Sequence, residues 1–166
     1  MQPNMKNNQM TDSEVSNLLD RMDVGAISTI GEDGFPYTVP VNHVVVDGMV
    51  YIHGRRLGEK MDNLKRDARV CFTVWDRKGY EDCGELACDT TTVYECVVVR
   101  GHVEFIDDDE TKSKVLLALV DKLAPGKKGM DAKKVPPTAV YRIVPETVTG
   151  KYHRPMSGNN VRTREC

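Results

Sequence analysis

The stretch GAISTIGEDGFPYTVPVNHVVVDGMVYIHGRRLGEKMDNLKRDARVCFTV, residues 25–74, determines the fold class of this 166-residue chain. Residues 37–46 and 49–53 have the apolar, β-branched composition of strands, and Asp47-Gly48 between them is the strongest short hairpin signal. From about Gly58 the apolar period becomes helical. The stretch therefore predicts consecutive antiparallel strands followed by a short helix.

Two further helices are predicted outside this stretch. Thr11 and Glu14 stand at capping-box spacing before a helix that ends near Asp23, and another helix begins near residues 107–109. The apolar residues expected on the buried side of the second helix are Val115, Leu116, Leu119, Val120 and Leu123.

More strands follow in the second half of the chain. Residues 92–106 are too long for one flat strand, and Gly101 within them predicts a bend or bulge. The polar residues 76–91 predict a surface loop, residues 138–144 a last strand, and residues 145–166 a polar tail. Six or so hairpin-linked strands with few helices predict a mainly β fold, an antiparallel barrel or sandwich with short flanking helices.

Composition and charge restrict the functional classes. Hydrophobic residues make up 40% of the chain and charged residues 29%, as in soluble globular proteins, and the net charge of −2 argues against a nucleic-acid-binding surface. No apolar run approaches the roughly 18–20 residues that span a bilayer, and the polar start is no signal peptide. We therefore expect one soluble, cytoplasmic domain without nucleic-acid or membrane partners.

The cysteines are odd in number and have no zinc-binding spacing, so no metal site is predicted. They are Cys71, Cys83, Cys88, Cys96 and Cys166. Cys71 and Cys96 lie in apolar, strand-like runs and are expected to be reduced structural thiols. A labile Cys83–Cys88 bridge is the alternative.

The basic segment HGRRLGEKMDNLKR, residues 53–66, is the first candidate site. Its five Arg and Lys side chains outnumber its two acidic ones, a local charge of +3. A helix that begins near Gly58 would offer free backbone N–H groups and a partial positive charge to a phosphate, with Lys60 and Arg55 adding charged donors. The alternative is a solvated basic helix.

Two strand segments are further candidates. Pro40, within residues 37–42, lacks an N–H for a strand ladder, so it marks an edge or bulge whose free main-chain groups suit a flat heteroaromatic ring. An ordinary edge strand is the alternative. Arg100 lies in an otherwise apolar strand and needs a partner or a path to solvent. The partner would be Glu95 or Glu104, and a bound anion is the alternative.

Together these motifs resemble the flavin-nucleotide-binding proteins of the pyridoxamine 5'-phosphate oxidase-like superfamily, and within it the nitroimidazole-resistance group. The resemblance runs in order through G-x-P-Y-x-V-P-V-N, the D-G hairpin, Y-I-H-G, G-x-K-x-D-N-L and V-C-F-T-V, and resumes at VYECVVVRGHVEFIDD and YRIVPETVTGK. It covers about residues 12–152 and implies a split β-barrel. On this basis residues 1–10 form a flexible N-terminus, 11–152 a single FMN-binding domain and 153–166 a polar tail.

The resemblance implies a homodimer with two FMN sites at the subunit interface. The residues that match the lining of the isoalloxazine ring are Val39, Pro40, Val41 and Asn42. Those that match the region of the ribityl phosphate are His53, Gly54, Arg55, Lys60 and Asn63. Those on the strand that borders the flavin are Tyr94, Cys96 and Val97. Where many relatives carry His before the lysine, this chain has Glu59.

The implied function is that of an FMN-dependent oxidoreductase acting on a small aromatic or nitroaromatic substrate, or on pyridoxamine phosphate itself, with NADH or NADPH as electron donor. No catalytic residue is assigned. His43 and His153 are candidate proton donors, with a structural role as the alternative. A non-catalytic flavin or haem carrier is a second hypothesis, for which the axial candidates are His43, His53, His102 and His153. An interaction module without a cofactor is the third.

Overall fold

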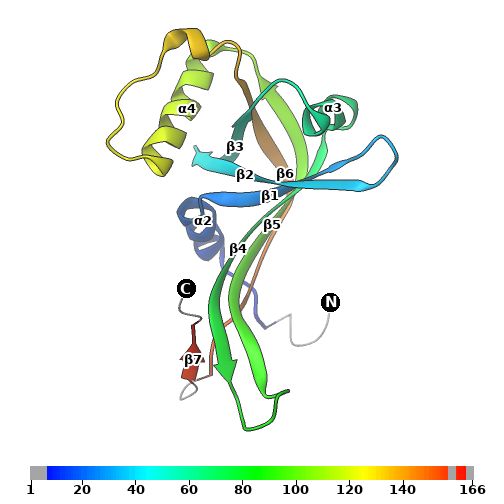
Figure 1. The fold of residues 1–166 in the computed structure, drawn as a ribbon, viewed down its shortest axis with the longest axis vertical. Coiled ribbons are helices and arrows are strands. Elements are labelled where there is room, and N and C mark those ends of the chain that lie inside the picture. Colours follow the sequence, from blue (N-terminus) through cyan, green and yellow to red (C-terminus); the bar gives the residue numbers. More distant parts are fainter. Residues whose placement is uncertain (1–6, 157–159, 164–166) are drawn as a thin grey trace.

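The structure, a computed structural model, describes residues 7–156 and 160–163 and consists of a β-barrel with a long stranded arm (Figure 1). In chain order the elements are α2 (Asp12–Arg21), β1 (Val24–Ile30), β2 (Pro36–Val46), β3 (Met49–Gly54), α3 (Glu59–Arg66), β4 (Arg69–Asp82), β5 (Thr90–Ile106), α4 (Asp109–Leu123), the 3-10 helix η1 (Ala132–Lys134), β6 (Ala139–His153) and β7 (Asn160–Arg162). The prediction of a mainly β, antiparallel fold is confirmed.

Six strands close into a ring. Their order is β1-β2-β3-β6-β5-β4, and β1 pairs again with β4, where Ala26 lies opposite Thr73. All of these pairings are antiparallel. The fold is therefore the antiparallel split β-barrel with short flanking helices that the resemblance implied.

Local signals account for the first elements. The Thr11 hydroxyl accepts from the Glu14 N–H at 3.3 Å, and the Glu14 carboxylate accepts from the Thr11 N–H at 2.8 Å, so the predicted capping box starts α2. Asp47 and Gly48 have positive φ values of 51° and 77°, as a type I′ turn between β2 and β3 requires. The hairpin prediction is confirmed.

The arm consists of residues 76–96 and 145–153 together with β7, and it projects away from α3 and α4 (Figure 1). β5 runs without interruption from the arm into the barrel. It bends at a bulge between Arg100 and Gly101, where a β-carbon on Gly101 would lie 2.0 Å from the carbonyl oxygen of Val144. The bend predicted from Gly101 is confirmed, and close backbone approach explains why the position requires glycine.

Two predictions for the arm are wrong. Residues 76–91 are not one loop, because β4 pairs with β5 as far as Asp82 and only residues 83–89 connect the strands. Residues 145–166 are not all tail, because β6 continues to His153. Both segments carry mostly polar side chains, which removes the apolar alternation by which a strand is identified.

Both chain ends make strand contacts in the described residues. The Met10 N–H donates to the Gly150 carbonyl at 3.0 Å, and Gln9 bridges to Lys151 on β6. Residues 160–162 of the expected tail pair with β4 as β7. The arm is therefore held at its edges by segments from both ends of the chain.

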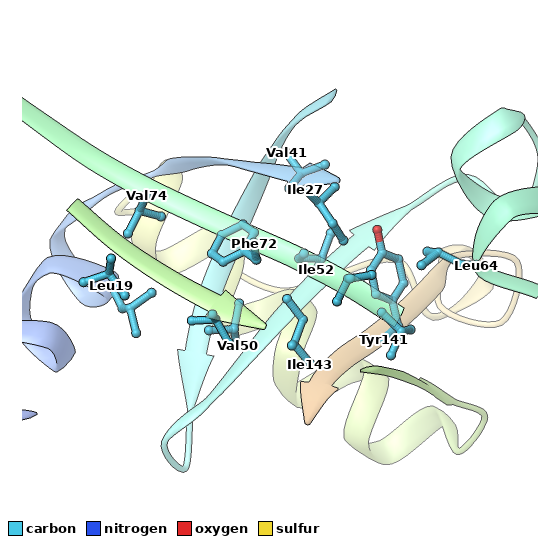
Figure 2. Close-up of a cluster of buried hydrophobic side chains, with 14 of the residues drawn as sticks. Leu19, Ile27, Val41, Val50, Ile52, Leu64, Phe72, Val74, Tyr141 and Ile143 are labelled. Carbon is cyan, nitrogen blue, oxygen red and sulfur yellow. The ribbon is translucent and has the colours of Figure 1, made fainter. Parts of the chain in front are cut away.

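The main apolar core fills the barrel (Figure 2). Phe72 and Ile52 are fully buried near its centre, and Leu64 of α3 and Leu19 of α2 close it from outside the sheet. A second cluster lies between α4 and the barrel and comprises Val44, Tyr51, Val115, Leu116, Leu119, Val135 and Val140. Leu123 exposes 37% of its surface, because α4 ends there, which corrects its predicted burial.

Candidate functional site

The first group of predicted site residues lies where β2 and β3 separate. The two strands pair only as far as His43 opposite Ile52; beyond this point β2 stays with β1, and β3 stays with β6, where Gly54 lies opposite Ala139. Residues 36–42 therefore have one edge without a strand partner in the described chain, which confirms the edge position predicted for this segment. Helix α3 follows β3 directly at this opening.

Helix α3 begins without a side-chain cap. Its N-cap, Gly58, has a φ of 108°, a conformation that favours glycine. The Gly58 carbonyl accepts from the N–H groups of Met61 and Asp62 at 2.8 and 3.1 Å. The N–H groups of Glu59 and Lys60 have no acceptor in the described chain. The start of the helix therefore offers two free donors and a partial positive charge to an anion.

Lys60 brings a charged donor to the same place. Its Nζ lies 3.8 Å from the position that a β-carbon on Gly54 would take, and 5.8 Å from the ring centroid of Tyr141. The side chain is half-buried, and Nζ has neither a hydrogen bond nor an ion pair within the described residues. Burial lowers the pKa of Lys60, and burial together with the Lys60 charge lowers the pKa of His53. This desolvated cation lacks the counter-charge that would stabilise it.

The neighbouring charged groups differ in their environments. Arg55 is exposed and has no partner in the described chain, whereas Arg56 donates to the Pro136 carbonyl at 2.9 Å. Glu59 lines, with Asp62, a separate acidic hollow of about 610 Å³. The positive charge available at the opening is therefore that of Lys60 and Arg55.

Asn63, expected in the phosphate region, lies inside the protein with an exposed fraction of 2%. Its Nδ2 donates to Thr29 Oγ1 at 3.1 Å, and its Oδ1 accepts from Arg66 at 3.1 Å. Arg66 also donates to the Ile30 carbonyl. These bonds fix α3 against β1, so Asn63 positions the helix that carries Lys60.

The four residues expected to line a ring alternate between the two faces of β2. Val41 is buried in the barrel core and Val39 packs against it, whereas Pro40 is exposed. Asn42 is half-buried, and its Nδ2 donates to the Asp23 carbonyl at 3.1 Å. A flat ligand at this edge would therefore contact Pro40 and the main chain rather than the Val41 side chain.

The three candidates on β5 also alternate. Val97 is fully buried in the core, whereas Tyr94 and Cys96 are half-buried on the outer face, opposite His153 and Lys151 of β6. Burial raises the pKa of the Cys96 thiol, which keeps it neutral at pH 7. Cys96 therefore contributes a small apolar surface to this face.

The structure brings the β3 and α3 candidates together, places the β2 candidates on the strand that separates from β3 there, and leaves those on β5 apart. His53 and Gly54 adjoin Lys60 at the point where β2 separates from β3. Cys96 lies across β1 and β4 from Asn42. The path from Asn42 to Cys96 therefore crosses three strand spacings, which amount to about 14 Å around the curved surface of the barrel.

The two histidines considered as proton donors have internal partners. His43 is fully buried, its Nε2 lies 2.8 Å from the Leu19 carbonyl oxygen, and burial lowers its pKa to about 4. His153 Nε2 lies 2.7 Å from the carboxylate of Glu81, whose exposed fraction is 1%. Both rings are therefore engaged within the fold, which supports the structural alternative for each.

Two polar groups, one half-buried and one buried, have no signal in the sequence. Lys122 of α4 donates to the carbonyls of Met22 and His43 at 2.6 and 3.3 Å, which ties α4 to the end of α2. The Tyr141 hydroxyl is buried below Lys60 without a hydrogen-bond partner among the described residues, and burial raises the pKa of Tyr141. Each depends on segments far apart in the chain, so no local pattern reports them.

Metal-binding and membrane-spanning features are absent from the part of the chain that the structure describes. Within it, no group of three or more His, Cys, Asp or Glu residues could hold a metal ion, and no helix has both the length and the apolar character to cross a membrane. Cys71, Cys88 and Cys96 are free thiols, so the alternative Cys83–Cys88 bridge is not formed. Cys166 lies outside the described residues.

Solved structures share this fold. They include the FAD- and haem-binding protein of Mycobacterium smegmatis (TM-score 0.77, 21% identity, 87% of this chain and 73% of that chain). The flavocytochrome Anf3 of Azotobacter vinelandii has a TM-score of 0.76 at 24% identity, over 87% of this chain and 68% of that chain. A candidate 5-nitroimidazole antibiotic resistance protein of Bacteroides thetaiotaomicron has a TM-score of 0.74 at 24% identity, over 86% and 85%. At these identities the likeness establishes the fold alone.

Sequence comparison gives the family. No curated protein matches the chain. The family profile described as pyridoxamine 5'-phosphate oxidase matches residues 11–152, which is most of the chain and includes every residue of the candidate site. The chain therefore belongs to the pyridoxamine 5'-phosphate oxidase family.

Proposed function

We propose that this chain is an FMN-binding flavoprotein, an oxidoreductase that acts on a small aromatic or nitroaromatic substrate. The observation that carries the proposal is the Lys60 ammonium, which is half-buried, has no acceptor in the described chain and adjoins free N–H groups at the start of α3. A desolvated cation is stabilised by an anion. Membership of the pyridoxamine 5'-phosphate oxidase family supports a flavin nucleotide as the molecule that supplies it.

The donor set fits a phosphate monoester. Lys60 supplies a charged donor, the main chain of Glu59 and Lys60 supplies two neutral ones, and the exposed Arg55 supplies a second charge. Gly54 leaves the space beside Lys60 Nζ without a side chain. Hydrogen bonds to a charged group contribute about 1.5–3 kcal/mol each. Several of them together favour a bound phosphate over a hydrated one.

The flavin ring would lie along the unpaired edge of β2. Pro40 offers an apolar contact, and the free main-chain groups of residues 36–42 offer donors and acceptors to the polar edge of the ring. The hydrogen bond from Asn42 to Asp23 holds the end of this edge in place. A bound flavin supplies hydride and electron transfer, and the chain binds, orients and shields it. No side-chain nucleophile is required.

We propose that a second copy of the chain completes each flavin site. Tyr94 and Cys96 match flavin-bordering residues of the family but lie across the barrel face from Asn42, about 14 Å away for Cys96. A homodimer that places β5 of one copy against the β2 edge of the other would bring them to the ring. Sedimentation gives the subunit number, and a monomer that binds FMN tightly would contradict the shared site.

The absorbance spectrum of the purified protein tests the cofactor. It should contain flavin bands, and denaturation should release FMN, which chromatography separates from FAD. A colourless protein that also fails to bind added FMN would overturn the proposal. If FAD is released instead, the protein is still a flavoprotein, but its nucleotide is FAD and not FMN.

A matched pair of lysine variants tests the phosphate contact. Lys60→Gln should weaken FMN binding about 10- to 150-fold, which corresponds to the loss of one hydrogen bond to a charged group. Lys65→Gln changes an exposed lysine on the same helix and should leave the affinity unchanged. Quenching of flavin fluorescence during titration of the apoprotein measures both. Equal affinity for FMN in the wild type and both variants would show that Lys60 does not contact the phosphate.

Anaerobic reduction separates an enzyme from a flavin carrier. NADH or NADPH should bleach the flavin bands of an oxidoreductase, and a nitroaromatic should then restore them. A flavin that neither nicotinamide reduces would favour the non-catalytic alternative.

One observation favours haem as a second candidate ligand. Within the described chain, His53 is the histidine whose ring has neither a hydrogen bond nor an ion pair. It borders an apolar cavity of about 190 Å³, also lined by Leu116, Leu119 and Met130. The haem proposal would replace the flavin proposal if the purified protein contained no flavin and gained a Soret band with hemin. The His53→Ala variant should then fail to gain this band.

A further inference from the structure

The partners of the arginines distinguish one residue on the barrel face. Eight arginines of the described chain donate to an acceptor or stack on an aromatic ring, and they are Arg21, Arg56, Arg66, Arg69, Arg77, Arg142, Arg154 and Arg162. Arg55 and Arg100 have no partner there. The carboxylate partners expected for Arg100 are engaged elsewhere, because Glu95 pairs with Arg21 and Glu104 pairs with Arg142. The predicted pairing with a carboxylate is therefore wrong. Arg100 is exposed, so it has the path to solvent that was the other expectation, and its guanidinium is open to an anion.

Arg100 lines a pocket of about 270 Å³ on the outer face of β1, β4 and β5. Ser28 lies opposite Cys71, and Cys71 lies opposite Arg100, so the three side chains form one row across the strands. Ile30 and Pro36 add an apolar wall. The pocket therefore combines a charged donor, a hydroxyl and an apolar surface, as a site for a small polar ligand does.

The charge of the pocket selects the kind of anion. No Asp or Glu lines it, and its second guanidinium, Arg69, is bonded to Asp67 at 2.6 Å. One positive charge, that of Arg100, is therefore uncompensated. A carboxylate carries one negative charge and matches the planar guanidinium through two parallel hydrogen bonds. A phosphate dianion would leave one negative charge unmatched.

The pocket adjoins the surface where the flavin ring would lie. The next row across the same strands consists of Pro40, Ala26, Thr73 and Val98. Two residues along a strand separate the rows, about 7 Å. One flat molecule can therefore reach both rows.

We propose that Arg100 binds the carboxylate of a small aromatic substrate, with Ile30 and Pro36 against its ring. Ser28 is the second donor, because its hydroxyl lies 2.8 Å from Thr38 Oγ1 and can accept from it while donating to the ligand. The inference rests on the proposed function only where it names this ligand the substrate. The pocket itself can be tested without the flavin, because the guanidinium and its row belong to this chain alone.

Calorimetric titration with 4-nitrobenzoate and the neutral analogue 4-nitrobenzamide tests the pocket. The wild-type protein should bind the carboxylate at least tenfold more tightly, and the preference should shrink as NaCl is added. Arg100→Gln should abolish the preference for the carboxylate. Arg100→Lys should retain only part of the preference, because its ammonium keeps the positive charge but lacks the planar guanidinium that forms two parallel hydrogen bonds. Arg77→Gln changes an exposed arginine on the arm and should retain the full preference.

Several outcomes would overturn the proposal. They are equal binding of the two ligands by the wild type, an unchanged preference in Arg100→Gln, and tighter binding of 4-nitrophenyl phosphate than of 4-nitrobenzoate. A change of Arg100→Gln from dimer to monomer with the preference intact would instead assign Arg100 to an ion pair between subunits.

Flavin content, measured on the same samples, separates this inference from the proposed function. A colourless protein that retains the carboxylate preference would reject the flavoprotein and keep the pocket. A flavin-loaded protein without the preference would reject the pocket alone.

Discussion

The barrel and the arm share β4, β5 and β6, yet different interactions stabilise them. In the barrel, side chains such as Phe72 and Ile27 are fully buried among apolar neighbours. Along the arm, charged groups pair instead: Arg21 with Asp76 and Glu95, and His153 with a buried Glu81. Apolar burial responds weakly to moderate salt concentrations, whereas ion pairs are screened by salt. One sheet therefore contains two regions that different perturbations should separate.

The largest effect is expected from a cavity in the barrel. Phe72 is fully buried and packs edge-on against His43 with 5.0 Å between ring centroids, so Phe72→Ala should lower the free energy of unfolding by about 3–5 kcal/mol. Phe35→Ala removes the same atoms from a side chain that is 73% exposed. It should change the free energy of unfolding by less than about 0.5 kcal/mol. Urea denaturation measures both. Similar losses in the two variants would contradict a barrel-centred core.

The barrel should also depend on pH through His43. Its pKa falls from 6.5 to about 4 on folding because of burial and the nearby Lys122 charge. Between pH 6.5 and 4 the unfolded chain therefore binds more protons, so this stabilisation is complete above pH 6.5 and is lost as pH falls towards 4. The loss should approach about 3 kcal/mol. Denaturation at several pH values should find this slope in the wild type and not in His43→Asn; an equal slope in both would exclude His43 as its source.

In the arm, the buried Glu81 carboxylate should have the next largest effect. It accepts from His153 and from the Met156 N–H, both at 2.7 Å. Glu81→Gln removes the charge from both bonds and should lower the free energy of local opening of residues 153–156 and 160–162 by about 1.5–3 kcal/mol, seen as faster amide exchange. Glu85→Gln, in the exposed loop, should leave exchange unchanged. Exchange that accelerates in the barrel rather than the arm would refute the local role.

The smallest effect belongs to the partly exposed ion pairs between α2 and the arm. Arg21 of α2 reaches Asp76 and Glu95 of the arm, and Arg21→Gln should cost about 0.5–1 kcal/mol at low salt. Near 1 M NaCl the difference should vanish, because exposed charges are then screened within about 3 Å. The loss in Phe72→Ala should be the same at both salt concentrations. If Arg21→Gln behaves likewise, packing rather than charge explains its effect.

The sequence predicts the barrel better than the arm. The hairpin at Asp47-Gly48, the capping box at Thr11 and the bulge at Gly101 are local signals, and the structure confirms all three. The continuation of β4 to Asp82 was missed, because a strand with mostly polar side chains on both faces has no apolar alternation. Pairing with β5 and β7, which no local window contains, forms it.

The candidate site divides in the same way. The free start of α3 follows from Gly58 and the residues next to it, so the sequence locates the Lys60 region. It does not indicate that the Asn63 amide would be hydrogen-bonded to Thr29 and Arg66, or that Arg100 would lack a carboxylate partner within the described residues. Those facts depend on which strands become neighbours, and residue spacing alone does not specify that.

The pairing of β3 with β6 also sets the order in which the chain can fold. Val50 lies opposite Ile143, 93 positions later (143 − 50), so the ring of strands is open until almost the whole chain has been synthesised. At about 5–20 residues per second the β1–β3 meander waits roughly 5–19 s with its core face uncovered. We expect the β3 amides that face β6 to be unprotected in a nascent chain that ends at residue 138, and protection of these amides would contradict this order.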